Sequence, residues 1–227
     1  MRFFLIGIQF LLVLNVCVAQ GLLLSDVRAS GKPLTADADG TVTGTPYLHD
    51  KWANGMVYIT EKIKSDNAWI RYDIYSDRVE VKDKENVFTL DPLRIKGFKY
   101  SINIDEELLE RHFRNGFTQI KSASSASYFE VLFEGKNTFL KRYTKKLGYD
   151  ATSYGSSSSK SFQDQSMFYV IKGNGEVIEF AETKKALFKA FPLNEKEIST
   201  FIKQNQIKVS DSEDMKKLSA YLDTLTL

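Results

Sequence analysis

The feature that most constrains the fold is a series of short segments between positions 56 and 102. The segments are rich in β-branched and aromatic residues, and Asn, Asp, Ser or Pro residues separate each from the next. This pattern predicts strands joined by tight turns, at residues 56–60, 68–75, 78–82, 87–90 and 97–102. The same pattern returns later in the chain and predicts strands at 128–134, 138–146, 167–172 and 176–181.

The register of the hairpin over residues 68–82 can be worked out from its sequence. If Ser76 and Asp77 form a two-residue turn, Asp73 lies directly opposite Glu80 and the apolar residues of both strands share one face. The opposite face of this hairpin then carries Trp69, Arg71, Asp73, Arg78, Glu80 and Lys82.

A second hairpin is predicted around Gly173-Asn174-Gly175, because Asn-Gly is the strongest short-range hairpin signal. With Asn174 and Gly175 as the turn, one face of this hairpin is expected to carry Tyr169, Ile171, Ile178 and Phe180.

The composition changes to helical patterns near the C-terminus. Apolar spacing and capping residues predict helices at 183–191, 195–204 and 211–225, with Pro192 ending the first. Asn194 and Ser210 are the expected caps of the second and third. A further helix is predicted over 104–117, where apolar residues have helical spacing behind an acidic start. The predicted fold class is therefore α+β, an antiparallel β-rich main body with a C-terminal group of three short amphipathic helices.

The N-terminus has the pattern of a secretory signal peptide. Arg2 precedes an apolar stretch at residues 3–18, and Cys17-Val18-Ala19 fits a cleavage site with small residues. We expect cleavage after Ala19 and export to the periplasm or the medium. Polar residues interrupt the apolar stretch, so it is too short for a spanning helix and leaves no transmembrane anchor after cleavage.

Charge and cysteine content exclude several classes of function. Removing Arg2 with the signal peptide leaves 30 of the 31 basic residues against 29 acidic ones, so no nucleic-acid partner is expected. Cys17 is the only cysteine, and its loss excludes disulfides, thiolate nucleophiles and cysteine metal ligands. His49 and His112 lie far apart without a second ligand nearby, so neither a metal site nor a cofactor is predicted.

The predicted organisation has four parts. Residues 1–19 form the signal peptide and residues 20–44 an irregular N-terminal segment. Residues 45–181 form the β-rich domain, with an exposed Ser-rich loop at 150–166, and residues 182–227 form the helical part.

No catalytic motif is present, and two groups of residues are candidates for binding. The first lies on the polar face of the hairpin and combines aromatic and charged residues: Trp69, Arg71, Asp73, Tyr75 and Glu80. The second comes from the most basic stretch of the chain, residues 136–146: Lys141, Arg142 and Tyr143. A solvated strand face or a protected sheet edge accounts for the second group equally well, and aromatics in a β domain are mostly core residues.

Four segments resemble a family of exported, uncharacterised proteins from Bacteroidota-type bacteria. They are GTPYL at 44–48, GMVYI at 55–59, IRYDIYSD at 70–77 and YLDTL at 221–225, and the resemblance covers roughly residues 43–227. It implies export and the β-rich architecture, and it carries no known activity and no functional residue.

The preferred interpretation is a non-enzymatic binding or envelope-associated module, whose partner is an envelope glycan, a lipid or a protein. The alternative is a hydrolase of envelope polymers that uses paired carboxylates from the cluster Asp105, Glu106, Glu107 and Glu110. Such a cluster is also typical of the start of a helix. An enzyme is expected to gather ionisable groups in one deep pocket, whereas a module is expected to present an open aromatic or basic face.

Overall fold

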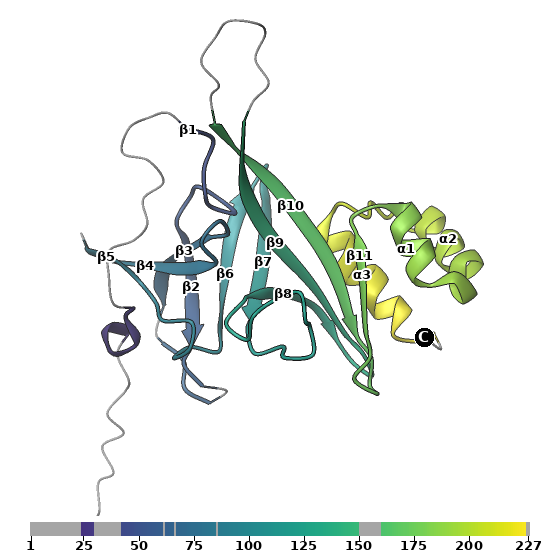
Figure 1. The fold of residues 1–227 in the computed structure, drawn as a ribbon, viewed down its shortest axis with the longest axis horizontal. Coiled ribbons are helices and arrows are strands. Elements are labelled where there is room, and N and C mark those ends of the chain that lie inside the picture. The colour runs from purple at the N-terminus through teal and green to yellow at the C-terminus, as the bar shows by residue number, and fades with distance from the viewer. Residues whose placement is uncertain are drawn as a thin grey trace, which may run out of the picture.

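The structure of the protein is a computed structural model that describes residues 24–29, 42–60, 62–65, 67–84, 86–149 and 160–225. The predicted signal peptide and its cleavage site lie outside these residues. All the described strands belong to one large, mostly antiparallel sheet, and three α-helices follow it in the chain (Figure 1). The predicted α+β class, with a β-rich body and three C-terminal helices, is confirmed.

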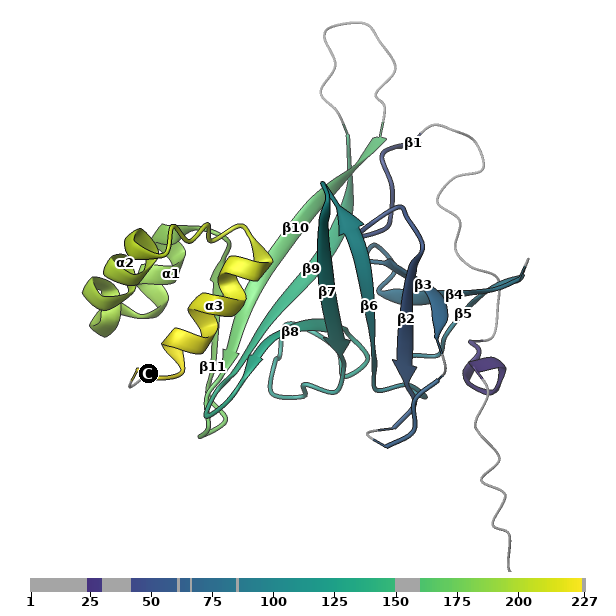
Figure 2. The same cartoon turned by 180° about the vertical axis from the view of Figure 1, so that it is seen from behind.

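The sheet has eleven strands in the order β1-β10-β9-β8-β7-β6-β2-β3-β4-β5, with β11 paired to β10. The strands are β1 (Val42–Thr43), β2 (Ala53–Tyr58), β3 (Ala68–Asp73), β4 (Arg78–Asp83), β5 (Asn86–Thr89), β6 (Gly97–Ile104), β7 (Glu107–Arg114), β8 (Phe129–Glu134), β9 (Thr138–Tyr149), β10 (Lys160–Ile171) and β11 (Val177–Ala181). The helices are α1 (Lys184–Ala190), α2 (Glu195–Gln204) and α3 (Ser212–Leu222), with 3₁₀ turns η1 (Leu24–Val27) and η2 (Pro192–Asn194). Figures 1 and 2 show the helices at one end of the molecule and β3, β4 and β5 at the other.

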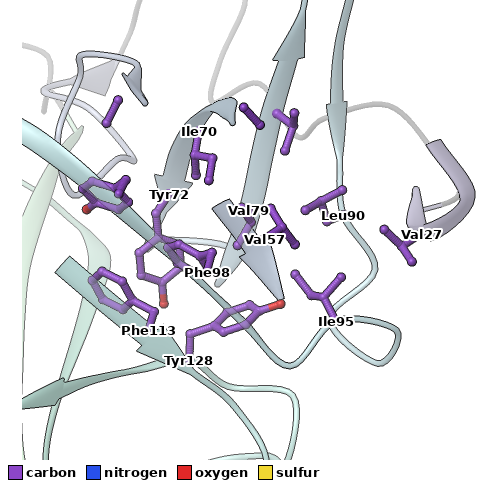
Figure 3. Close-up of a cluster of buried hydrophobic side chains, with 14 of the residues drawn as sticks. Val27, Val57, Ile70, Tyr72, Val79, Leu90, Ile95, Phe98, Phe113 and Tyr128 are labelled. Carbon is purple, nitrogen blue, oxygen red and sulfur yellow. The ribbon is translucent and has the colours of Figure 1, made fainter. Parts of the chain in front are cut away.

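The sheet curls so that the β3–β4 hairpin approaches β9 and β10. β1 pairs in parallel with β10, and a few residues later Tyr47 forms an antiparallel bridge to Asp73 at the end of β3. At the tip of the hairpin, Asp77 accepts a hydrogen bond from Arg142 of β9. The curl encloses an aromatic core of buried residues, and Phe98 and Phe113 stack at its centre with ring centroids 4.8 Å apart (Figure 3).

The same inner face of the sheet continues from this core to the helices. Successive paired residues share a face, and the pairing gives a row across β6 to β11. This row, here called the inner row, is Phe98, Phe113, Glu130, Lys141, Phe168 and Phe180. Beyond it, α3 packs on β8 and α1 on β11. Their apolar faces form a second core with the sheet, which includes Leu187, Ile198, Met215, Leu218 and Leu222.

Asp223, directly after α3, connects the end of this helix to the β8–β9 turn through hydrogen bonds. Its carboxylate accepts hydrogen bonds from the backbone amides of Lys136 (2.9 Å) and Asn137 (2.7 Å). Burial would raise the pKa of this carboxyl, but these hydrogen bonds and a third from the Asn137 side chain lower it.

The helix caps agree only in part with the sequence. Thr183 caps α1 by accepting from the amide of Ala186, whereas Asn194 makes no side-chain cap at α2. Asp211, and not Ser210, caps α3 by accepting from the amide of Asp214. The third helix therefore begins one residue later than its predicted cap implies.

The predicted helix over 104–117 is wrong, because these residues form the end of β6, a turn and strand β7. Ile104 pairs with Glu107, so Asp105 and Glu106 make a two-residue turn in which both have positive φ, 49° and 69°. A type I′ turn requires this backbone and usually has Asn-Gly. Because this turn lacks Asn-Gly, it was not recognised in the sequence, and the spacing of Leu108 and Leu109 was interpreted as that of a helix.

The turn of the first hairpin is longer than predicted. Asp73 pairs with Arg78 instead of Glu80, and the Asp73 carboxylate accepts from the amides of Tyr75 and Ser76. This side-chain cap holds a four-residue turn and moves the register by two residues. An even shift leaves every side chain on its predicted face.

The late hairpin has the predicted strands but a register shifted by one residue. Gly175 has a φ of 86° and donates to the carbonyl of Lys172, so the turn has three residues instead of two. Phe168 and Val170, not Tyr169 and Ile171, therefore share a face with Ile178 and Phe180. Tyr169 and Ile171 are buried on the opposite face, in a third core.

Two predicted boundaries also change. In the segment predicted as irregular, Val27 is buried in the aromatic core and β1 joins the sheet, so parts of residues 20–44 belong to the domain. Of the predicted Ser-rich loop, residues 160–166 form the start of β10, and residues 150–159 lie outside the described residues. None of the helices within the described residues is both long and apolar enough to cross a bilayer.

Candidate functional site

The face of the sheet opposite the aromatic core is open over strands β4, β3, β2, β6 and β7. Pairing aligns one residue from each of these strands in a row: Lys82, Trp69, Asn54, Ser101 and Glu110. Their side chains share one face because directly paired residues point the same way. We call this surface the outer face.

Three hollows lie along the outer face. The first, of about 310 Å³, is lined by Trp52, Trp69, Lys82 and Lys84. The second, of about 330 Å³, includes Asn54, Met56, Lys99, Ser101 and Glu110, with Lys216 of α3 at its margin. The third, of about 450 Å³, is lined by Tyr58, Thr60, Lys96, Arg114 and Asn115. His112 lines both the second and the third, so these two hollows adjoin.

Positive charge dominates the lining of these hollows. Glu110 is the one carboxylate among the described lining residues, whereas seven lining residues are cationic: Lys82, Lys84, Lys96, Lys99, Arg111, Arg114 and Lys216. Arg111, Arg114 and Lys216 are held in ion pairs with glutamates. The four lysines form no ion pair with any described residue. Against these four lysines stands one unpaired lining carboxylate, Glu110, so the lining keeps a net positive charge.

Trp69 is the most exposed aromatic of the first hollow, with 52% of its surface accessible. It lies opposite Lys82 on one side and opposite Asn54 on the other. With more than half of its surface accessible, the ring can be reached by a flat ligand ring. A large exposed aromatic side chain among cations is a common feature of binding surfaces.

Arg71 lies on the same face as this tryptophan and is held by several contacts. Its guanidinium carbon lies 3.6 Å from the ring centroid of Tyr47 and 4.5 Å from that of Trp52. Two guanidinium nitrogens donate to one oxygen of Glu80, at 3.2 and 2.8 Å, and a third hydrogen bond goes to the Tyr47 hydroxyl. Tyr47 and Trp52, which precede the hairpin in the sequence, therefore cover Arg71.

The pKa of Tyr47 is raised to about 12, mainly by burial and then by the Glu80 carboxylate. The phenol therefore stays protonated at neutral pH and donates to Glu80 at 3.4 Å. Arg71 stacks on Trp52 and so holds that ring in place. Because Glu80 neutralises the charge of Arg71, the two residues together add little net charge to the outer face.

His112 lies at the junction of the second and third hollows, against the ring of Tyr58 at 5.7 Å. Burial lowers its pKa, and the positive charge of Arg114 adds to the shift. His112 is therefore neutral at neutral pH and offers both a donor and an acceptor nitrogen.

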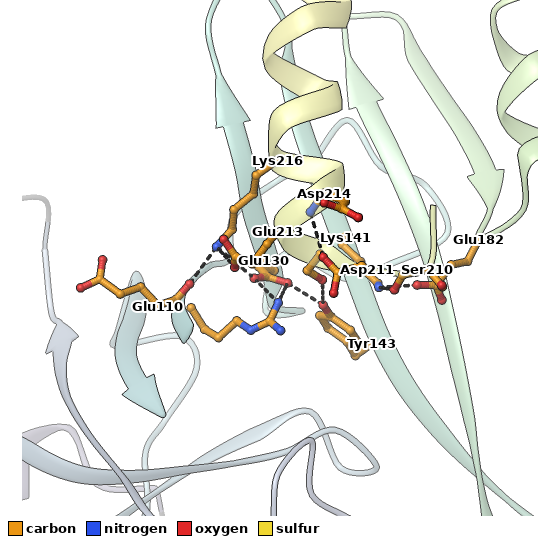
Figure 4. Close-up of polar contacts among 12 residues, drawn as sticks. Glu110, Glu130, Lys141, Tyr143, Glu182, Ser210, Asp211, Glu213, Asp214 and Lys216 are labelled. Atoms are coloured by element: carbon orange, nitrogen blue, oxygen red, sulfur yellow. Dashed lines mark hydrogen bonds and ion pairs between the residues drawn. The ribbon is translucent and has the colours of Figure 1, made fainter. Parts of the chain in front are cut away.

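The inner side of β7 is held by a buried polar network at the start of α3 (Figure 4). Glu130, with no exposed surface, accepts from Arg111 Nη1 at 2.9 and 3.1 Å and from the Tyr143 hydroxyl at 2.5 Å. Ser212 lies 2.6 Å from the same hydroxyl, and Lys216 donates to the carbonyl of Glu110 at 2.8 Å. This network joins α3 to the strand that carries His112.

Burial raises the pKa of Tyr143 well above its usual value, and the Glu130 carboxylate adds to the shift. Burial alone would lower the pKa of Arg111, but the Glu130 carboxylate, together with smaller contributions from Tyr143 and Tyr100, outweighs it and raises that pKa. Tyr143 is therefore a neutral donor and Arg111 a permanent cation, as a stable network requires.

The first predicted group is only partly brought together. Trp69, Arg71 and Glu80 lie on the outer face, as predicted. Asp73 is buried and caps the hairpin turn. Tyr75 lies in that turn, six residues after Trp69, and its ring contacts Phe162 with the ring centroids 5.3 Å apart.

The second predicted group does not form a basic surface. Lys141 is 3% exposed and pairs with Glu182 on the inner face, next to Tyr143 in the buried network. Arg142 points to the opposite side of β9 and pairs with Asp77 at 3.3 Å. Both cations are paired with carboxylates, and they lie on opposite faces of β9, so the basic stretch of the sequence is not a basic surface of the structure.

The carboxylates proposed for a hydrolase lie around the β6–β7 turn. Asp105, Glu106, Glu107 and Glu110 are all exposed, and of the four only Glu110 lines a hollow. No hollow of the outer face brings two described carboxylates together, and no group of potential metal ligands occurs among the described residues.

The residues that sequence reasoning missed are Lys99, Lys96 and the outward side chains of β7. Lys99 and Ser101 alternate with buried Phe98, Tyr100 and Ile102. This alternation could have placed both on the outer face of the predicted strand. His112 and Arg114 were missed because β7 was interpreted as a helix. Comparison of the chain with protein-family models, with curated proteins and with solved structures finds no match in any of the three.

Proposed function

We propose that this protein is an exported, non-enzymatic binding module that holds an acidic glycan on its outer face. The observation that carries the proposal is the row of three adjacent hollows, lined by unpaired lysines and one exposed tryptophan. The secretory pattern at residues 1–19 supports a ligand found outside the cytoplasm.

The chemistry of the hollows suits a chain of charged sugars. The apolar face of a sugar ring can stack on the Trp69 indole, and its carboxylates or sulfates can pair with Lys82, Lys84 and Lys99. Asn54, Asn67 and Ser101 offer hydrogen bonds to hydroxyl groups. An open face across several strands accommodates several units of a polymer, whereas a small molecule is usually enclosed.

A binding role is favoured over hydrolysis because the hollows lack paired carboxylates among the described residues. Hydrolysis of a glycosidic bond needs two carboxyl groups about 5 to 9.5 Å apart on either side of the bond. Among the lining residues that the structure describes, Glu110 has no such partner in the second hollow.

The test is calorimetric titration with an oligosaccharide of galacturonic acid, and with a neutral glucose oligosaccharide of similar length. We expect binding of the acidic sugar alone, weakening with salt because the unpaired lysines are exposed. Trp69→Ala should weaken binding about tenfold or more, as loss of one stacking aromatic does elsewhere. Lys82→Ala with Lys99→Ala should weaken it and reduce the salt dependence.

The matched control is Lys203→Ala on α2, an exposed lysine far from the outer face in sequence and outside its hollows. Equal losses for Lys203→Ala and for the outer-face variants would argue against a specific face. Preference for a single-stranded oligonucleotide, or cleavage of the sugar, would replace the proposal with nucleic-acid binding or hydrolysis.

A further inference from the structure

The turn between α1 and α2 presents an aliphatic side chain directly to solvent. Leu193 is 92% exposed, the highest value of the exposed large apolar residues among the described residues. It follows Phe191, which is buried, and Pro192, which begins the 3₁₀ turn η2. The buried ring and the fixed backbone of proline hold Leu193 outward, so its exposure is built into the turn.

Three exposed lysines lie on α1, the helix before this turn. Lys184, Lys185 and Lys189 of α1 are exposed, and none forms an ion pair within the described part of the chain. A shallow depression of about 550 Å³ beside Leu193 is lined by Lys185, Phe188, Lys189, Pro192 and Glu195. Glu195 is the one acidic residue of that lining against two lysines, so the lining carries a net positive charge. We call Leu193 with these three lysines the α1–α2 tip.

We propose that the α1–α2 tip docks on the surface of an anionic lipid bilayer. An aliphatic side chain can insert at the level of the headgroups while neighbouring lysines contact lipid phosphates, and their aliphatic stems tolerate partial burial. The charges of the tip and of such a surface are complementary.

The size of the tip favours lipid over a folded partner. A stable protein interface buries about 800 Å² on each partner around an apolar centre. The tip offers one leucine, 92% exposed, and the depression beside it adds an exposed proline and a half-buried phenylalanine. This is enough for weak, reversible contact with a bilayer and too little for the core of a protein interface.

The position of the tip is compatible with the proposed glycan site. The helices lie at one end of the molecule and β3, β4 and β5 at the other (Figures 1 and 2). Contact of the α1–α2 tip with a membrane therefore leaves the outer face of β3 and β4 free. The docking proposal does not depend on the glycan, and each can fail without the other.

The test uses the exported form beginning at Gln20, because the apolar stretch 3–18 would itself partition into lipid. Leu193→Trp places a fluorescent side chain at the tip, and Leu93→Trp is the matched control at another leucine, 74% exposed. With vesicles of phosphatidylcholine and phosphatidylglycerol, we expect a blue shift and quenching by brominated lipid for Trp at 193 and not at 93. Phosphatidylcholine alone should give a much smaller change.

In co-sedimentation with the same anionic vesicles, Lys185→Glu with Lys189→Glu should reduce the bound fraction at least about tenfold. The melting temperature should stay unchanged, since these side chains are exposed and unpaired. Unchanged emission at 193, or equal binding to neutral and anionic vesicles, overturns the proposal. So does a blue shift that depends on protein concentration without vesicles, which would assign the tip to contact with a second copy.

Discussion

Two rows of side chains cross the same sheet on opposite faces, and charged residues in them serve different purposes. In the inner row, Glu130 and Lys141 lie directly opposite each other, and each has further partners in a buried network. In the row on the outer face, Lys82 has no carboxylate partner among the described residues, and Trp69 is open to solvent. The inner row holds the structure together, whereas the outer row is available to a ligand.

The difference teaches that a cluster of cations in sequence says little about a basic surface. Lys141 and Arg142 are neighbours on β9, yet their carboxylate partners, Glu182 and Asp77, come from distant parts of the chain. The lysines that stay unpaired are spread over several strands. What distinguishes the two kinds of lysine is the presence of a carboxylate brought near by the fold.

The largest expected effect comes from removing the acid of the inner row. Glu130→Ala leaves Arg111 and Tyr143 buried without their acceptor, so the free energy of unfolding should fall by about 3 to 5 kcal/mol. Glu134→Ala is the matched control, since Glu134 is also on β8 and pairs with an arginine of β7, but in an exposed pair. That control should cost at most about 1 kcal/mol. Equal urea denaturation curves for the two variants would contradict the distinction between the faces.

Arg71 shares features of both rows. It lies on the outer face, but it stacks on two aromatic rings and forms an ion pair with Glu80. We expect Arg71→Ala to lower the stability by about 2 to 3 kcal/mol, because it leaves the buried Glu80 without its charged donor. Arg71→Lys should recover only part of this, since lysine cannot stack in the same way or donate to Glu80 and the Tyr47 hydroxyl from a planar group. A loss below about 0.5 kcal/mol in chemical denaturation would show that Glu80 is well solvated without Arg71.

The fold could be predicted from sequence where local patterns were sufficient. Alternation and turn residues located most of the strands, and the hairpin predicted over 68–82 kept its faces although its register was wrong by two residues. The late hairpin was wrong by one residue, which exchanged its faces. Strand β7 was missed because Asp105 and Glu106 adopt a turn that their residue types disfavour.

The candidate site was harder to predict than the fold. Trp69, Arg71 and Glu80 were found because they belong to one hairpin, whose faces follow from period-two alternation. Lys99 and His112 join the same face only through the order of the strands, β3-β2-β6-β7, which local sequence does not determine. The burial of Lys141 likewise depends on Glu182, which reaches it from the segment after β11.

Lys141 and Lys99 provide the most direct test of the difference between the inner and outer faces, since both are lysines on strands of one sheet. Lys141→Ala removes the partner of Glu182 and contacts with Tyr143 and Phe168, and should cost about 1 to 3 kcal/mol. Lys99→Ala should change stability by less than about 0.5 kcal/mol. Thermal and chemical denaturation of both variants check this. A similar cost for both would mean that Lys99 has a structural partner.

The two histidines extend the comparison to pH. The pKa of His49 is lowered to about 4, mainly by burial and then by the charge of Arg111. The unfolded chain, with a pKa near 6.5, binds more protons between these values, so stability should fall as pH drops from about 6.5 to 4. One group contributes at most about 1.4 kcal/mol per pH unit, and solvent access to the ring reduces this. The difference between the pH–stability curves of the wild type and His49→Gln should show this slope; coincident curves would contradict it.

The smallest expected effect is a change in the pKa of one histidine, and not the other, when ligand binds. His112 lines two hollows of the outer face, so a bound polyanion should favour its protonated form and raise its pKa. His49 lines none of these hollows, and its pKa should stay unchanged. NMR titration of both imidazoles, with and without the galacturonic acid oligosaccharide, measures the two values in one sample. Equal shifts at both positions would indicate a change in the whole domain and would remove the support for a ligand at His112.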